Sequence, residues 1–63
     1  MKVIKIGKNE FVPAHNIDMV FIKDKKPKTL FVRTVGGVTI EKKYTNKDVC
    51  EEEYERIYNE LAK

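Results

Sequence analysis

The chain has 63 residues, of which 41% are hydrophobic and 37% are charged, and its formal net charge is +3. This length accommodates one small domain, residues 1–63, and excludes a second core or a separate catalytic lobe. The single cysteine, Cys50, excludes an internal disulfide and a cysteine-based zinc site, which are the usual supports of very small domains. We therefore expect self-association, most simply as a homodimer, to supply additional burial.

Apolar residues occur in short runs that charged residues interrupt. No uncharged run exceeds seven residues, and residues 11–17, which include Pro13, are too short to span a bilayer. Residues 1–8 interleave lysines with apolar residues and so lack the continuous apolar stretch of about 7–15 residues that a signal peptide needs. These features predict a cytoplasmic protein without membrane insertion. The bias toward lysine, isoleucine and asparagine is compatible with a bacterial or phage origin.

Strand signals come first in the chain. Charged and branched apolar residues alternate in residues 2–6, which predicts a half-buried strand, and the turn residues 7–9 lead into a short return strand over residues 10–12. Residues 17–23 are the most apolar stretch and predict a third strand. A polar connection over residues 24–27 follows.

Two further strands, residues 28–35 and 38–44, flank Gly36-Gly37 and predict a hairpin with a two-residue type I′ turn. Such a turn places Val35 opposite Val38. The face with the odd-numbered residues of the first strand carries more bulky apolar groups, so we assign it to the core. This assignment also brings Arg33 and Lys42 to the core face, where both would have to extend to solvent at its edge.

In residues 17–23 we assign Ile17, Met19 and Phe21 to the core, because Asp18 shares the other face. Four apolar residues then gather on the back of the sheet: Val20, Ile22, Leu30 and Val32. One helix covers only one face, so this patch would be open to water and is the candidate interface of the homodimer. Closure of the sheet into a small barrel is the alternative, because it would cover the patch within one chain.

The clearest helix is predicted in residues 45–63, with Thr45 or Asn46 as its N-cap. Its apolar residues fall on one stripe at helical spacing: Cys50, Tyr54, Ile57, Tyr58 and Leu61. The predicted fold is therefore α+β, with a four- or five-stranded antiparallel meander in residues 1–44 and one C-terminal amphipathic helix.

Catalytic residue sets are missing from the sequence. The chain has no serine, and its one histidine, His15, lies in a predicted bend without partners for acid–base work. The glutamates of residues 51–55 are spread around the helix instead of converging on a metal ion. We expect no enzymatic activity, no metal site and no cofactor.

Charge is divided unevenly along the chain. Residues 1–44 carry ten basic and four acidic side chains, a net charge of +6, whereas residues 45–63 carry a net charge of −3. Six lysines are candidate contacts for nucleic-acid phosphates: Lys23, Lys25, Lys26, Lys28, Lys42 and Lys43. Lysine supplies point charges, so such binding would be non-specific, and edge lysines that oppose aggregation are the alternative interpretation.

Three segments resemble the small flagellar FlbD-type proteins: residues 7–12, residues 17–22 and the stretch Leu-Phe-Val-Arg-Thr-Val-Gly-Gly of residues 30–37. This resemblance implies a small cytoplasmic accessory factor without catalytic residues. The element order is also similar to that of single-stranded-DNA-binding coactivators with four strands and a C-terminal helix, although their aromatic-rich strands are missing.

The sequence as a whole favours a non-enzymatic protein-interaction or accessory module, whose partner is a second copy or another protein. The alternative is a small basic nucleic-acid-binding protein that uses the lysine-rich sheet. The two differ in their response to salt, because phosphate binding weakens steeply with added salt and apolar docking does not.

Overall fold

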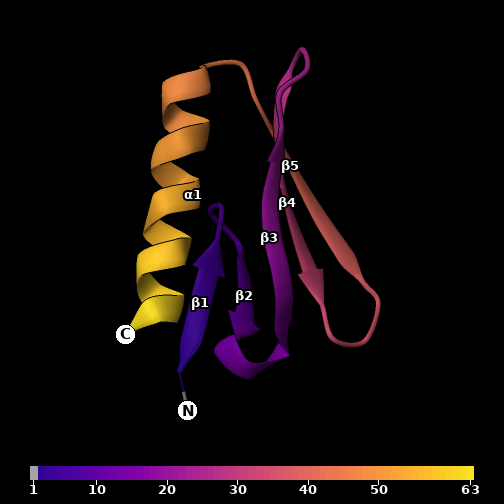
Figure 1. The fold of residues 1–63 in the computed structure, drawn as a ribbon, viewed down its shortest axis with the longest axis vertical. Coiled ribbons are helices and arrows are strands. Elements are labelled where there is room, and N and C mark those ends of the chain that lie inside the picture. The colour runs from indigo at the N-terminus through magenta and orange to yellow at the C-terminus, as the bar shows by residue number, and fades with distance from the viewer. Residues whose placement is uncertain (1) are drawn as a thin grey trace.

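The computed structural model describes residues 2–63 as two antiparallel sheets and one helix (Figure 1). The first sheet pairs β1 (Val3–Ile6) with β2 (Glu10–Pro13), and a short 3-10 turn at Ala14–Asn16 follows. The second sheet has the order β3 (Ile17–Lys23), β4 (Lys28–Thr34), β5 (Thr39–Tyr44) and precedes α1 (Lys47–Ala62). The predicted α+β class is confirmed, and the sheets do not close into a barrel.

Helix α1 begins at the predicted cap. The Oδ1 atom of Asn46 accepts hydrogen bonds from the backbone N–H groups of Asp48 (2.9 Å) and Val49 (3.4 Å). These bonds satisfy two of the N–H groups that have no partner within a helix. The helix therefore begins at Lys47, and two residues separate it from the end of β5.

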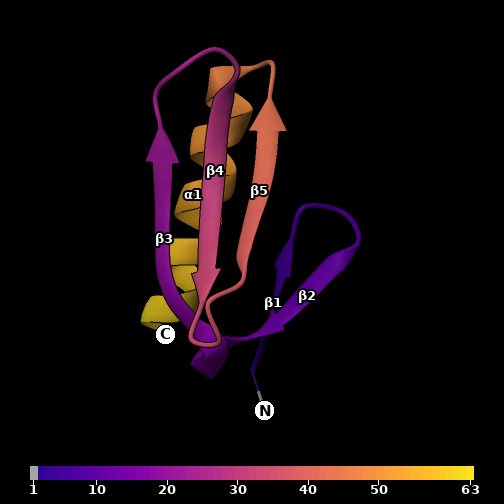
Figure 2. The same cartoon turned by 90° about the vertical axis from the view of Figure 1, so that its right-hand side faces the viewer.

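Helix α1 covers one face of the three-stranded sheet, as the two orthogonal views show (Figures 1 and 2). Cys50 and Ile57 are completely buried, and Tyr54 packs against them. The predicted stripe was too wide, because Tyr58 is 62% exposed and Leu61 is 36% exposed. Tyr58 follows Ile57 by about 100° around the helix axis, which carries it out of the contact with the sheet.

The β4–β5 hairpin corrects the predicted register. The Thr34 N–H donates to the Val38 carbonyl (2.8 Å), and the Gly37 N–H donates to the Thr34 carbonyl (3.0 Å). Gly37 has a φ of +89°, the left-handed conformation that closes a three-residue loop with a bulge. The loop is one residue longer than the type I′ turn, so Val32 lies opposite Ile40.

This one-residue difference reverses the faces of β4. Leu30 and Val32 point toward α1 and are completely buried, whereas Phe31 and Arg33 lie on the outer face. Arg33 is exposed there and bonds Asp18. Arg33 is thereby removed from the core face, whereas Lys42 stays on the inner side, as predicted, and pairs with Glu10 at the edge of the core.

A bulge in β3 corrects its predicted faces as well. Ile17 lies opposite Thr34 and Met19 lies opposite Arg33, so Asp18 is the extra residue. Because of the bulge, Ile17 and Val20 both pack against the core, while Met19 is turned outward and is 45% exposed.

The predicted dimer interface on the back of the sheet is therefore wrong, because this surface is not free. Its four members belong to the hydrophobic core or pack against it: Val20, Ile22, Leu30 and Val32. They are the residues that α1 covers, so a homodimer would have to use a different surface.

The N-terminal hairpin completes the core from the side of β5 (Figure 2). Ile4 and Ile6 of β1 and Val12 of β2 are buried in the same cluster as Leu30 and Ile57. An ion pair between Lys42 and Glu10 connects the two sheets at their polar border.

Replacement of Ile57 by alanine is expected to cost about 2–5 kcal/mol of unfolding free energy, because it leaves a cavity between α1 and the sheet. Replacement of the exposed Glu52 by alanine is the control and is expected to cost about 0.5 kcal/mol or less. Urea denaturation monitored by circular dichroism measures both. Equal, small losses would contradict the packing of α1 described here.

Candidate anion-binding site at the β3–β4 turn

Lysines gather at one end of the molecule because of the strand order. β3 ends, β4 begins, β5 ends and α1 starts at this end (Figure 1). Lys23 and Lys43 lie on either side of Thr29 in one row across the sheet. The lysine end is defined by six residues: Lys23, Lys25, Lys26, Lys28, Lys43 and Lys47.

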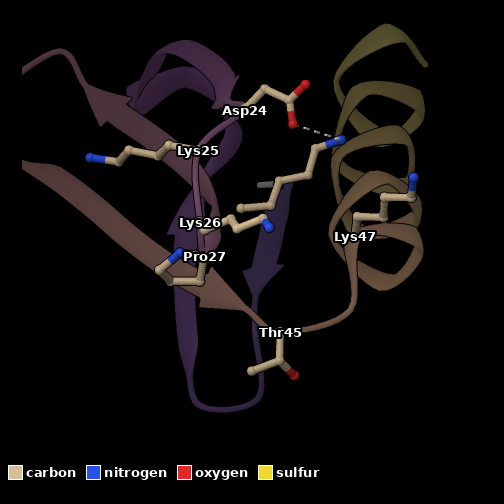
Figure 3. A pocket seen from close by; sticks show the side chains of 7 residues that line it. Asp24, Lys25, Lys26, Pro27, Thr45 and Lys47 are labelled. Atoms are coloured by element: carbon tan, nitrogen blue, oxygen red, sulfur yellow. Dashed lines mark ion pairs between the residues drawn. The ribbon is translucent and has the colours of Figure 1, made fainter.

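Four of these lysines line a cavity of 680 Å³ between the β3–β4 turn and the start of α1 (Figure 3). Its remaining lining residues are Asp24, Pro27 and Thr45. The lining of the cavity thus contains four ammonium groups and one carboxylate. Lys25 and Lys47 extend to opposite sides of the cavity, so the positive charge is spread along its rim.

The lysines differ in how far their charge is neutralised. The Nζ atom of Lys28 lies 3.3 Å from Glu51 and 3.8 Å from Asp24, and the Nζ atom of Lys43 lies 3.7 Å from Glu41. Lys25, Lys26 and Lys47 are exposed, and none has a carboxylate within 4.0 Å in residues 2–63. These three side chains leave the site with an uncompensated positive charge.

Lys42 does not belong to the site, although the sequence predicted it there. Neighbouring residues of a strand point to opposite faces, so Lys42 turns away from Lys43. It lies opposite Leu30 on the inner side and forms an ion pair with Glu10. Conversely, the sequence analysis did not include Lys47 in the site. The short connection between β5 and α1 could have indicated it, because the helix must then begin at the end of the sheet where β3 turns into β4.

The aromatic rings beside the lysine end are covered by neighbouring side chains. Phe21 and Phe31 stack with centroids 5.0 Å apart and an interplanar angle of 8°. The Nζ atom of Lys23 lies 5.4 Å from the Phe31 centroid, and Phe31 is only 9% exposed. Phe31 therefore offers no ring face on which a base could stack.

The remaining candidate groups do not assemble a second site. His15 is exposed in the turn Ala14–Asn16, and no three His, Cys, Asp or Glu side chains within residues 2–63 are placed to hold a metal ion together. Burial raises the pKa of the Cys50 thiol, and the nearby Lys28 opposes this effect. In the same part of the chain, no helix has the length and apolar character needed to cross a membrane.

Comparison of the chain with protein-family models, curated proteins and solved structures finds no match. The similarity to FlbD-type proteins and to single-stranded-DNA-binding coactivators therefore rests on the sequence segments and element order alone.

Because its thiol is buried, Cys50 is expected to make the protein less stable at alkaline pH. Burial raises the pKa of the Cys50 thiol and that of the Tyr44 hydroxyl above their ordinary values. The unfolded chain then binds fewer protons than the native one, so stability falls as the pH rises above about 8.5, the ordinary pKa of a thiol.

Urea denaturation of the native chain and of Cys50→Ala at pH 7 and at about pH 9.5 measures this effect. The alanine variant is less stable at pH 7 because it lacks the buried sulfur, but it loses less stability between the two pH values. The same pH-dependent loss in both proteins would show that the thiol is not the titrating group.

Proposed function

We propose that the protein is a non-enzymatic binding protein that holds the phosphate backbone of a nucleic acid at its lysine end. The observation that carries the proposal is the group of three exposed lysines without acidic partners, Lys25, Lys26 and Lys47, around one cavity. Neutralisation of phosphates by such side chains releases condensed counterions, and this release drives binding.

The arrangement fits a row of phosphates better than one phosphate group. A single anion is bound tightly when several donors converge on it. Lys25 and Lys47 instead extend away from each other across the cavity (Figure 3), and Lys23 and Lys43 continue the positive surface onto the outer face of the sheet. A nucleic-acid strand supplies phosphates at regular intervals along such a path.

Sequence preference is not expected from this surface. Base recognition generally uses arginine, asparagine or glutamine presented to a groove, whereas the lysine end offers ammonium groups. Arg33, on the outer face, is held by Asp18 through hydrogen bonds of 2.8 and 3.1 Å. Phe31 is buried, so base stacking does not add to the contact.

The protein-interaction function, which the sequence favoured, loses the surface that supported it, because the predicted apolar patch lies under α1. The lysine cluster, by contrast, is brought together by the fold, apart from Lys42. The balance of the two predictions therefore favours nucleic-acid binding as the function of the lysine end.

The variant Lys25→Gln/Lys26→Gln/Lys47→Gln is expected to bind a fluorescent oligonucleotide at least about tenfold more weakly than the native chain at low salt. The slope of log K against log salt is expected to become shallower by about 2, since each single-strand phosphate contact contributes about 0.7. Fluorescence anisotropy with single- and double-stranded oligonucleotides measures both quantities.

A matched control, Lys5→Gln/Lys8→Gln/Lys63→Gln, removes the same charge from exposed lysines outside the lysine end. It is expected to retain most of the affinity. Equal losses in the two variants would show that net charge, and not the lysine end, determines binding. No binding by the native chain at about 10 µM protein and low salt would overturn the proposal, since non-specific binders have dissociation constants of about 1–100 µM even at physiological salt.

A further inference from the structure

The outer edge of β3 is unpaired. Within residues 2–63, β3 bonds to β4 on one side only and forms the edge of the sheet away from β5 (Figure 2). Its seven residues span about 23 Å at the rise of an extended strand. An edge of this kind presents a row of backbone N–H and C=O groups that can pair with another strand.

The hydrogen-bond pattern identifies the groups at this edge. The Thr34 N–H points to β5, where it donates to Val38, and the Val35 N–H points the other way and donates to the Asn16 carbonyl (2.7 Å). Because these directions alternate along an antiparallel ladder, β4 uses its odd-numbered residues to bond β3. The backbone groups of Val20 and Ile22 are therefore directed to the free edge.

The centre of this edge has none of the features by which proteins usually block strand pairing. Residues 19–22 are four consecutive apolar residues, and β3 contains no proline. Its charged side chains, Asp18 and Lys23, lie toward its two ends, and the bulge also lies near its start. Blocked edges instead carry a central charge, a proline or a central bulge.

We propose that the free edge of β3 pairs antiparallel with β3 of a second copy of this chain, which gives a two-fold dimer with one continuous six-stranded sheet. The register that keeps inner faces together is centred on Phe21. Val20 then lies opposite the partner's Ile22, and the N–H and C=O groups directed to the edge bond each other in pairs.

Charge complementarity identifies the occupant as a second copy. The two charged residues of β3, Asp18 toward its start and Lys23 at its end, have opposite signs. In the antiparallel dimer, Lys23 lies opposite the partner's Met19 and next to the partner's Asp18. The Asp18 side chain is 49% exposed beside Arg33 and is therefore accessible to a second cation.

The aromatic pair points to the same occupant. One ring face of Phe21 stacks on Phe31, which lies on the β4 side, so its other face is turned toward the free edge. The two-fold axis would bring the partner's Phe21 against this face, in a position where opposite side chains approach closely. The stacked pair would become a row of four rings across the sheet.

Analytical ultracentrifugation of the native chain and two variants of Met19 tests the proposal. Met19 is 45% exposed, so both variants keep the monomer fold, which thermal melts at low concentration check. Met19→Lys places a lysine opposite the partner's Lys23 twice in each dimer, and we expect dissociation to become about tenfold easier. Met19→Glu places opposite charges there and is expected to dimerise at least as tightly as the native chain.

Hydrogen exchange by NMR locates the contact directly. An interface of one strand pair is small, so the series runs from about 10 µM to 1 mM. Exchange of the Val20 and Ile22 amides is expected to slow as concentration rises, while the Phe21 amide, already bonded to β4, changes little. A native chain that is monomeric throughout, equal weakening by both Met19 variants, or a dimer without slowed exchange at Val20 and Ile22 would overturn the proposal.

Discussion

The contact between α1 and the inner face of the three-stranded sheet is the constraint on which the other features depend. Ile57 and Cys50 of the helix share one core cluster with Leu30 and Val32 of β4. In residues 2–63, α1 is the one layer packed on this sheet, and the opposite face of the sheet is uncovered. That choice of face decides which residues lie on the outer face, among them Lys23, Lys43 and the stacked pair of Phe21 and Phe31.

The periodicity of the sequence was sufficient to predict the elements but not their faces. The strands, the helix and its Asn46 cap were found because alternation and capping are local signals. The register of the β4–β5 hairpin depends on whether Gly36-Gly37 forms the whole loop or part of a three-residue loop, and both fit the dipeptide. A difference of one residue moved Val32 from the predicted back of the sheet into the core.

The lysine end was largely predictable for a similar reason. Lys25 and Lys26 adjoin Pro27 in a polar connection, where no register is needed to expose them. Lys42 was wrongly grouped with Lys43, although the predicted faces already placed it on the inner side, and Lys47 was missed because its position depends on the path from β5 into α1. Local exposure was thus predicted better than spatial neighbourhood.

The unequal division of charge along the chain has a spatial consequence. The acidic side chains Glu52 and Glu55 of α1 are exposed to solvent, whereas most of the lysines lie on the strands and the β3–β4 turn. The molecule therefore carries an electric dipole in addition to its net charge. In the field of a polyanion, this dipole would rotate the protein so that the sheet leads and the helix trails before any contact forms. Such orientation acts only within about 10 Å at 0.1 M salt, so salt would lower the association rate as well as the affinity.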